Sequence, residues 1–393
     1  MYTGPKLIND ELVFGYDAGY GVANNNTPTR FYPGEPTVNL MTSHFESLGT
    51  DGSGQSSVGT RTAIATNHVR IVDNGSNTRQ HVYVSSLTAG TTYTLSNQFK
   101  KISGTPTWRY QIQAYNNSSY VSTIKFTNTA EIGLLDIDGW QTAKWTFTLP
   151  ANSNKVLIFF QDGADYTTYD HSFEVKNPQL EAKGHATPYV SGTRSNTQSL
   201  IDLKRTTDTT VAYMSFDSTG QPEFDGTDDY VDLGSDITIS PINQGWTAEY
   251  VFNSDSASTL QHFNSAEADS ENSNWLALFQ SYLQVWDHGQ NVWRKGSTVF
   301  SSNTWYHVAF VQLDGDSMQF YVNGVAEGGD HVSFTWTAAR SALITRYIGR
   351  YEYNNSYGRY FNGHIPIARL YDAPLTAAQI KQNYKAYKNR FNI

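Results

Sequence analysis

The stretch 346–361 concentrates side chains that could hold a sugar. Sugar rings present C–H faces that pack on aromatic rings, and their hydroxyl groups bond to amides and charged groups. The tyrosines of this stretch are interleaved with arginine and asparagine, so the pattern predicts a glycan-binding or interface loop. Its candidate contact residues are Arg350, Tyr351, Tyr353, Asn354, Tyr357 and Arg359.

Two further aromatic groups stand in polar surroundings. Trp286 and Trp293 flank one such segment, and Tyr166 and Tyr169 lie in another. Tyrosine, tryptophan and arginine are also concentrated in protein interfaces, so oligomer packing explains the same pattern. For a single tyrosine, a core or interface position is favoured over ligand contact. For the loop 346–361 as a whole, both interpretations stay open.

Acid–base hydrolysis of a glycan needs a rigid pair of carboxylates, and one segment has carboxylates at a suitable spacing. The segment 267–271 reads Glu-Ala-Asp-Ser-Glu, which places carboxylates at alternate residues. A retaining glycosidase holds two carboxylates about 5–5.5 Å apart on rigid backbone. The flanking asparagines and serines are typical of a loop, and the sequence contains no Gly-x-Ser-x-Gly, His-Glu-x-x-His or phosphate-loop motif. We therefore expect a protein that is not an enzyme.

A metal site is an alternative at one acidic turn. Asp225, Asp228 and Asp229 could supply the carboxylate oxygens that a calcium ion prefers. Aspartate beside glycine is also what β-turns select, and Gly226 follows Asp225. The turn is the favoured interpretation, calcium stays the alternative, and no other cofactor is expected.

The composition excludes several classes of protein. The 393 residues include no cysteine, so there is no disulfide framework, thiolate metal site or cysteine nucleophile. The formal net charge of −9 argues against nucleic acid as a partner. No apolar run approaches the ~20 residues that span a bilayer, so no membrane partner is expected. The first residues lack the pattern of an export signal, which favours a protein made in a cytoplasm.

Most of the chain follows the two-residue period of β-strands. Residues 108–114 alternate apolar and polar side chains, whereas Val156–Phe160 and Tyr306–Val311 are apolar on both faces and indicate central strands. Asn323-Gly324 predicts a tight type I′ hairpin. The fold class predicted is all-β, with two antiparallel β-sandwiches of the jelly-roll type and a short C-terminal helix.

The helix is indicated by its start signal and by one apolar stripe. Thr376 and Gln379 have the spacing of a capping box. The residues of the stripe follow at intervals of three and four, as one face of an amphipathic helix requires. They are Ile380, Tyr384, Tyr387 and Phe391.

Four segments of the second half carry a family resemblance. In order, they are 224–231 (FDGTDDYV), 305–309 (WYHVA), 320–324 (FYVNG) and 361–376 (FNGHIPIARLYDAPLT). Together they resemble the laminin G-like branch of the concanavalin A-like lectin and glucanase superfamily. The resemblance implies that Leu12–Ala18 is the opening strand of that sandwich and pairs near the last one.

The same resemblance implies a discontinuous domain. Residues 1–40 would supply its first strand and a linker, residues 196–393 would supply the remainder, and residues 41–195 would form an inserted domain. The insert resembles the jelly rolls of carbohydrate-binding modules more loosely, in segments 91–95, 145–149 and 179–189.

The whole layout resembles structural proteins of tailed bacteriophages. The resemblance implies a non-catalytic virion component, such as a capsid decoration, head fibre, collar or tail fibre, that is assembled in the host cytoplasm. Its partners would be other virion proteins and further copies in a homo-oligomer, with a host surface glycan as a further partner. An adhesin or lectin that reads host polysaccharide is the alternative primary role. A glucanase-like enzyme is the third.

Overall fold

The chain was analysed in a computed structural model, and its described residues are 7–18, 35–41, 60–72, 79–104, 108–127, 131–132, 139–162, 172–217, 219–239, 245–266, 275–287, 292–314, 317–329, 342–353 and 356–393. It divides into two compact units. Unit 1 combines Met1–Pro36 with Ser195–Ile393, and unit 2 is Thr37–Arg194. These divisions, at 36/37 and 194/195, fall near the boundaries at 40/41 and 195/196 that the family resemblance implies.

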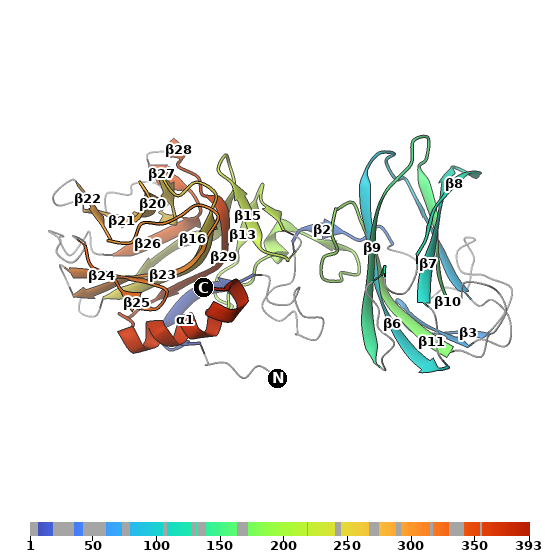
Figure 1. The fold of residues 1–393 in the computed structure, drawn as a ribbon, viewed down its shortest axis with the longest axis horizontal. Helices are drawn as coiled ribbons and strands as arrows, with labels where there is room; N and C mark the ends of the chain where they lie inside the picture. The colour runs from blue at the N-terminus through green and yellow to red at the C-terminus, as the bar shows by residue number, and fades with distance from the viewer. Residues whose placement is uncertain are drawn as a thin grey trace. The chain divides into compact units, whose positions relative to one another are not determined.

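Unit 1 is built around one large antiparallel sheet (Figure 1). Its central strands are apolar on both faces, and tight turns connect several of its neighbours. In spatial order the strands are β14 (Ser215–Phe216), β15 (Pro222–Asp225), β29 (Asn362–Tyr371), β17 (Trp246–Ser254), β23 (Trp305–Asp314), β24 (Ser317–Val322) and β25 (Val325–Ala326), with β1 (Leu12–Asp17) also paired to β29.

Strand β1 joins this sheet from far away in the sequence. Phe14 lies opposite Leu370, and Tyr16 lies opposite Ala368. The Tyr16 hydroxyl donates to the carbonyl of Ile365 at 2.9 Å. This is the pairing with the last strand that the family resemblance implies, and it buries Leu12, Phe14 and Tyr16 while Val13 is partly buried.

Smaller sheets complete unit 1. Residues from these sheets and from the large sheet share one apolar core, which includes Val231, Trp246, Leu278 and Phe310. One small sheet contains β13 (Thr210–Ala212), β16 (Tyr230–Ile239), β26 (Leu343–Ile348) and β19 (Asn264–Ser265). A second contains β18 (Gln261–His262), β20 (Leu276–Phe279), β21 (Tyr282–Asp287) and β22 (Val292–Lys295), and a two-stranded one contains β27 (Tyr351–Tyr353) and β28 (Ser356–Gly358).

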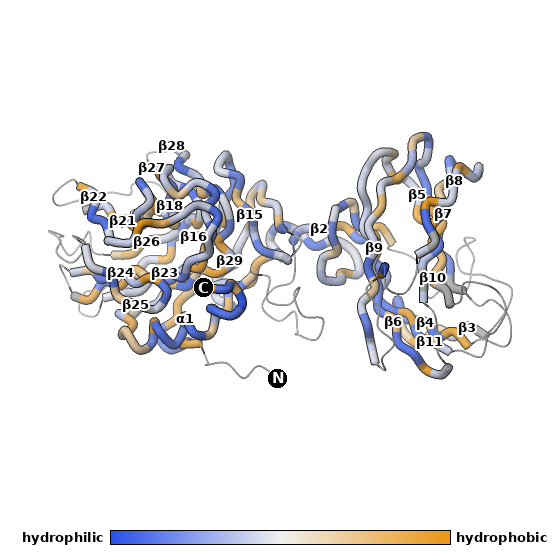
Figure 2. Tube along the Cα trace, viewed as in Figure 1, coloured by the Kyte–Doolittle hydropathy of each residue, from blue (hydrophilic) through white to orange (hydrophobic). Residues whose placement is uncertain are grey.

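Helix α1 (Ala377–Phe391) begins where the sequence predicts. The Thr376 side chain accepts from the backbone N–H of Gln379, and the Gln379 side chain returns to the Thr376 backbone. Ile380, Tyr387 and Phe391 are buried, while hydrophilic residues cover the other face (Figure 2). Among the described residues, no helix is long and apolar enough to cross a membrane.

Unit 2 is an antiparallel two-sheet structure with its own apolar core. In β7 (Trp108–Asn116), the alternate residues Trp108, Tyr110 and Ile112 are buried, as the sequence pattern predicts. One sheet orders β5 (Arg79–Ser85), β10 (Lys155–Asp162), β7 and β8 (Ser119–Phe126). The other orders β3 (Thr60–Ala65), β4 (His68–Val72), β11 (Ser172–Glu181), β6 (Thr92–Ser103) and β9 (Trp140–Thr148), and β2 (Thr37–Val38) pairs separately with β12 (Thr193–Arg194).

Candidate functional site

Three tryptophans gather on the small sheet that holds β20, β21 and β22. Trp286 and Trp293 are directly opposite in the β21–β22 register, and their ring centroids are 5.3 Å apart. Trp275 precedes β20 and stacks on Trp286 with centroids 5.9 Å apart and 23° between the ring planes. All three side chains are half-buried, so the hairpin presents a partly open aromatic surface.

The β27–β28 hairpin adds a fourth ring to this surface. Tyr351 meets Trp275 edge to face, with centroids 5.3 Å apart. The exposed Arg359 places its guanidinium 4.3 Å from the Tyr351 ring centroid. We call Trp275, Trp286, Trp293 and Tyr351, with Arg359 at their edge and His262 beneath, the aromatic cluster.

His262 on β18 is the buried member of the aromatic cluster. It is 0% exposed, its ring lies 4.8 Å from Tyr351, and it also contacts Trp275 and Trp293. Within the described residues, neither ring nitrogen has a hydrogen-bond partner of good geometry, although the backbone of Asn264 lies close enough to favour the protonated ring. Burial, and secondarily the charge of Arg359, lower the pKa of His262 to about 3, although the Asn264 backbone opposes part of the shift. The imidazole is therefore neutral near pH 7.

The opposite face of the same hairpin is closed by internal contacts. The Arg350 guanidinium lies 3.6 Å from the Tyr347 ring centroid, 3.9 Å from that of Tyr230 and 4.5 Å from that of Tyr357. It also donates to Glu352 at 2.8 Å, and both charged groups are buried. Arg350 therefore holds the hairpin in place and does not face solvent.

The structure places only part of the predicted set. Trp286, Trp293, Tyr351 and Arg359 meet in the aromatic cluster, while Arg350 and the exposed Tyr357 lie in the closed group. Tyr353 pairs with Ser356 at the end of β27. Asn354, Tyr166, Tyr169 and the acidic segment 267–271 lie outside the described residues.

Sequence reasoning did not single out His262. It stands between Gln261 and Phe263, and nothing in that short pattern marks a ligand-binding residue. Only the pairing of β18 with β20 brings it under the tryptophans. The one feature that marks His262 is a polar ring at a position that the structure shows to be fully buried.

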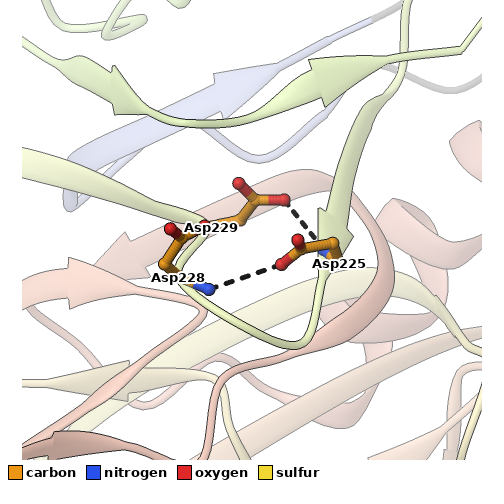
Figure 3. A group of neighbouring side chains, drawn as sticks. All are labelled: Asp225, Asp228 and Asp229. Atoms are coloured by element: carbon orange, nitrogen blue, oxygen red, sulfur yellow. Dashed lines mark hydrogen bonds between the residues drawn. The ribbon is translucent and has the colours of Figure 1, made fainter.

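The acidic turn is held by its own hydrogen bonds (Figure 3). Carboxylate atoms of Asp225, Asp228 and Asp229 lie within 4.8 Å of one another. The Asp225 carboxylate accepts from the backbone N–H of Thr227 at 2.7 Å, and that of Asp229 accepts from the Asp225 backbone at 2.8 Å. Burial raises the pKa of Asp229 to about 6. These bonds are those of an aspartate-stabilised turn, and calcium binding there stays a proposal.

A second buried polar group lies beneath helix α1. Glu249 accepts from Asn383 at 2.9 Å and from the Tyr371 hydroxyl at 3.2 Å, and its other oxygen lies 2.6 Å from His307 Nε2. Asn383 in turn accepts from the backbone N–H of Ile8. We call Glu249, His307, Tyr371 and Asn383 the polar network; it joins β17, β23, β29 and α1.

Comparison with known proteins agrees with the sandwich seen in unit 1. Residues 225–381 match the family model described as the concanavalin A-like lectin/glucanases superfamily. The aromatic cluster and the acidic turn both fall within the matched residues. Unit 1 has a concanavalin A-like fold in a mostly β protein. A search of curated proteins found no match.

Several solved structures are distantly similar. One is the receptor binding domain of botulinum neurotoxin C/D mosaic serotype, with 11% identity, a TM-score of 0.32, and coverage of 48% of this chain and 49% of that chain. Another concerns botulinum neurotoxin type C, whose cell entry is dependent upon interaction with two ganglioside molecules, with 10% identity, a TM-score of 0.34, and coverage of 48% and 49%. A third is a mutant of Trypanosoma rangeli sialidase displaying trans-sialidase activity, with 15% identity, a TM-score of 0.34, and coverage of 48% and 31%. The chain thus spans about half of the two toxin domains and less of the sialidase.

Proposed function

We propose that the protein binds glycans through the aromatic cluster of unit 1 and does not cleave them. The observation that carries the proposal is the half-open surface of Trp275, Trp286, Trp293 and Tyr351, which three separate parts of the chain supply. Apolar rings left partly open on a rigid sheet suit the C–H faces of a sugar.

The polar groups at this surface fit the same ligand class. Arg359 is exposed and offers several N–H donors to sugar hydroxyl or carboxylate oxygens. Because Arg359 already lies beside the Tyr351 ring, a sugar stacked on the neighbouring tryptophans would be within its reach. The neutral His262 beneath the rings adds no competing charge.

The test is a glycan array with the full chain, followed by titration calorimetry on the glycans that bind. We expect Trp286→Ala and Trp293→Ala each to weaken binding about tenfold or more, because each removes one stacking ring. Tyr357→Ala is the matched control, since this exposed tyrosine lies with the closed group around Arg350. Unchanged affinity in both tryptophan variants, or no glycan bound at all, would contradict the proposal.

The absence of catalysis is a separate part of the proposal. It is supported by the polar loop composition around segment 267–271 and by the burial of Glu249 in the polar network. Incubation with β-glucans should release no new reducing ends. Appearance of such ends, lost in a Glu267→Gln or Glu271→Gln variant, would instead favour the glucanase-like alternative.

A finer proposal concerns where this glycan-binding surface is displayed. We propose a structural component of a tailed-bacteriophage virion, present as a homo-oligomer among other virion proteins, and the sequence resemblance is what supports it. Mass spectrometry of purified particles and antibody labelling in electron micrographs test the location. A chain found in host extract and never in particles would leave the adhesin or lectin role without the virion.

A further inference from the structure

A cavity lies against helix α1 in unit 1, on the side of β1. Its volume is about 320 Å³, which is within the range of small-molecule pockets. The walls are formed mainly by aliphatic side chains and by the ring of Tyr387. The lining residues that matter here are Leu7, Leu12, Leu203, Ala386, Tyr387 and Arg369.

The charged groups around the cavity are predominantly positive. Lys204, Arg369 and Arg390 line it, and Asp17 is the one carboxylate among its lining residues. Asp17 is already paired with Arg390, which also donates to the carbonyl of Ala18. Arg369 donates to the Tyr371 hydroxyl, which itself bonds to the buried carboxylate of Glu249. Lys204 has no carboxylate partner among the described residues and adds a positive charge that would attract an anion.

Two hydrogen-bonding atoms of the lining residues are closed to water and have no partner among the described residues. Arg369 and Tyr387 are each 2% exposed. Among the described residues, neither the Arg369 Nε nor the Tyr387 hydroxyl makes a hydrogen bond, although the Arg369 Nη1 donates to Ile8 and Asn9. Buried polar groups are nearly always satisfied, so both atoms need an acceptor. Burial also raises the pKa of the Tyr387 hydroxyl, which keeps it protonated and able to donate.

We propose that this cavity binds a small organic carboxylate with an apolar body. The two carboxylate oxygens would accept from Arg369 and Tyr387, and the apolar part would pack on the leucine side chains. A phosphate group would bring a second negative charge and more bound water into walls that are largely aliphatic, so a monoanion fits better. A neutral sugar would leave the buried guanidinium N–H without a charged acceptor. The site is independent of the aromatic cluster.

The test is titration calorimetry of the full chain with octanoate. We expect saturable one-to-one binding, with 1-octanol at least tenfold weaker and inorganic phosphate unable to compete. Tyr387→Phe should weaken octanoate about tenfold, because it removes one donor to a charged acceptor. Since that hydroxyl has no hydrogen-bond partner among the described residues, the variant should fold normally, which its melting curve checks.

Tyr384→Phe is the matched control. Tyr384 precedes Tyr387 by three residues on the apolar stripe and is not among the residues that line the cavity. Leu203→Trp should fill the cavity and abolish binding without touching either donor. The proposal is overturned if octanoate gives no binding, if 1-octanol binds equally well, if phosphate competes, or if Tyr387→Phe and Leu203→Trp both bind like the parent.

Discussion

Two histidines in the described part of unit 1 are fully buried, and their surroundings differ completely. His307 belongs to the polar network, and its Nε2 lies 2.6 Å from a carboxylate oxygen of Glu249. His262 lies among aromatic rings, and neither of its nitrogens is hydrogen-bonded within the described part of the chain. The same residue type, equally removed from water, is therefore a bonded part of the structure in one place and an isolated neutral ring in the other.

The two histidines mark two kinds of region, the polar network that stabilises the fold and the aromatic cluster that we propose for ligand binding. In the polar network, both oxygens of Glu249 have partners, and the network ties three strands to the C-terminal helix. In the aromatic cluster, the rings pack on one another and their side chains stay half-buried. We therefore expect changes in the polar network to act on stability and changes in the aromatic cluster to act on binding.

The largest effect is expected from Glu249→Leu. This change removes the carboxylate partner of His307 and one of the two acceptors of the Asn383 amide, and breaking a buried pair of this kind costs about 3–5 kcal/mol. Denaturant unfolding would measure the loss of unfolding free energy. Glu223→Leu on β15 is the matched control, because Glu223 is exposed and should change stability by less than about 0.5 kcal/mol. A loss below about 1 kcal/mol for Glu249→Leu would contradict the structural role of the network.

A pH effect of somewhat smaller size is expected from His262. Burial lowers its pKa from 6.5 to about 3, so the unfolded chain binds more protons than the folded chain between these values. Stability from this residue is complete above pH 6.5 and falls as the pH is lowered toward 3. By linkage, the loss is on the order of 3 kcal/mol between about pH 6.5 and about pH 4.

His262→Leu removes this titration and should flatten the curve of unfolding free energy against pH in that window. At neutral pH it should change stability by less than about 1 kcal/mol, because the ring packs mainly on aromatic side chains and its interaction with the Asn264 backbone is weak in geometry. Parallel curves for parent and variant would show that the ring is not held neutral among the tryptophans.

Local sequence signals were enough for much of the fold. The capping box at Thr376 works because each of its hydrogen bonds joins residues only three apart. The hairpin at Asn323-Gly324 is confirmed by positive φ at both residues, +49° and +75°. Alternation predicted the buried face of β7, since side chains on successive residues of a strand point to opposite sides. The pairing of β1 with β29 has no local signal and was predicted only from the family resemblance.

The site was less predictable, because neighbours in sequence lie on different faces. Arg350 and Tyr351 are adjacent, yet Arg350 is enclosed by three tyrosine rings while Tyr351 joins the tryptophans. Which face each one takes depends on the register of β26 and β27 against their neighbours. Trp286 and Trp293 were easier, because both stand out as aromatic residues that flank a polar segment. His262 needed the pairing of β18 with β20, a contact that composition does not encode.

The smallest effect is expected at the buried carboxylate of Asp229. Its contribution to stability changes with pH in the direction opposite to that of His262. Burial raises its pKa from 3.8 to about 6, so its stabilising contribution is present below 3.8 and is lost as the pH rises through 6. The ionised carboxylate is therefore unfavourable near neutral pH, and Asp229→Asn should raise the unfolding free energy by about 1 kcal/mol there and have little effect near pH 4. Asparagine can still accept from the Asp225 backbone N–H, so the turn is kept.

The same pair of proteins tests the calcium alternative. An ion held by three carboxylates would make Asp229→Asn destabilising at neutral pH instead of stabilising. If about 1 mM calcium raises the melting temperature of the parent by several degrees and not that of Asp229→Asn, the acidic turn is a metal site. If the parent melts at the same temperature with and without calcium, it is a turn stabilised by its own aspartates.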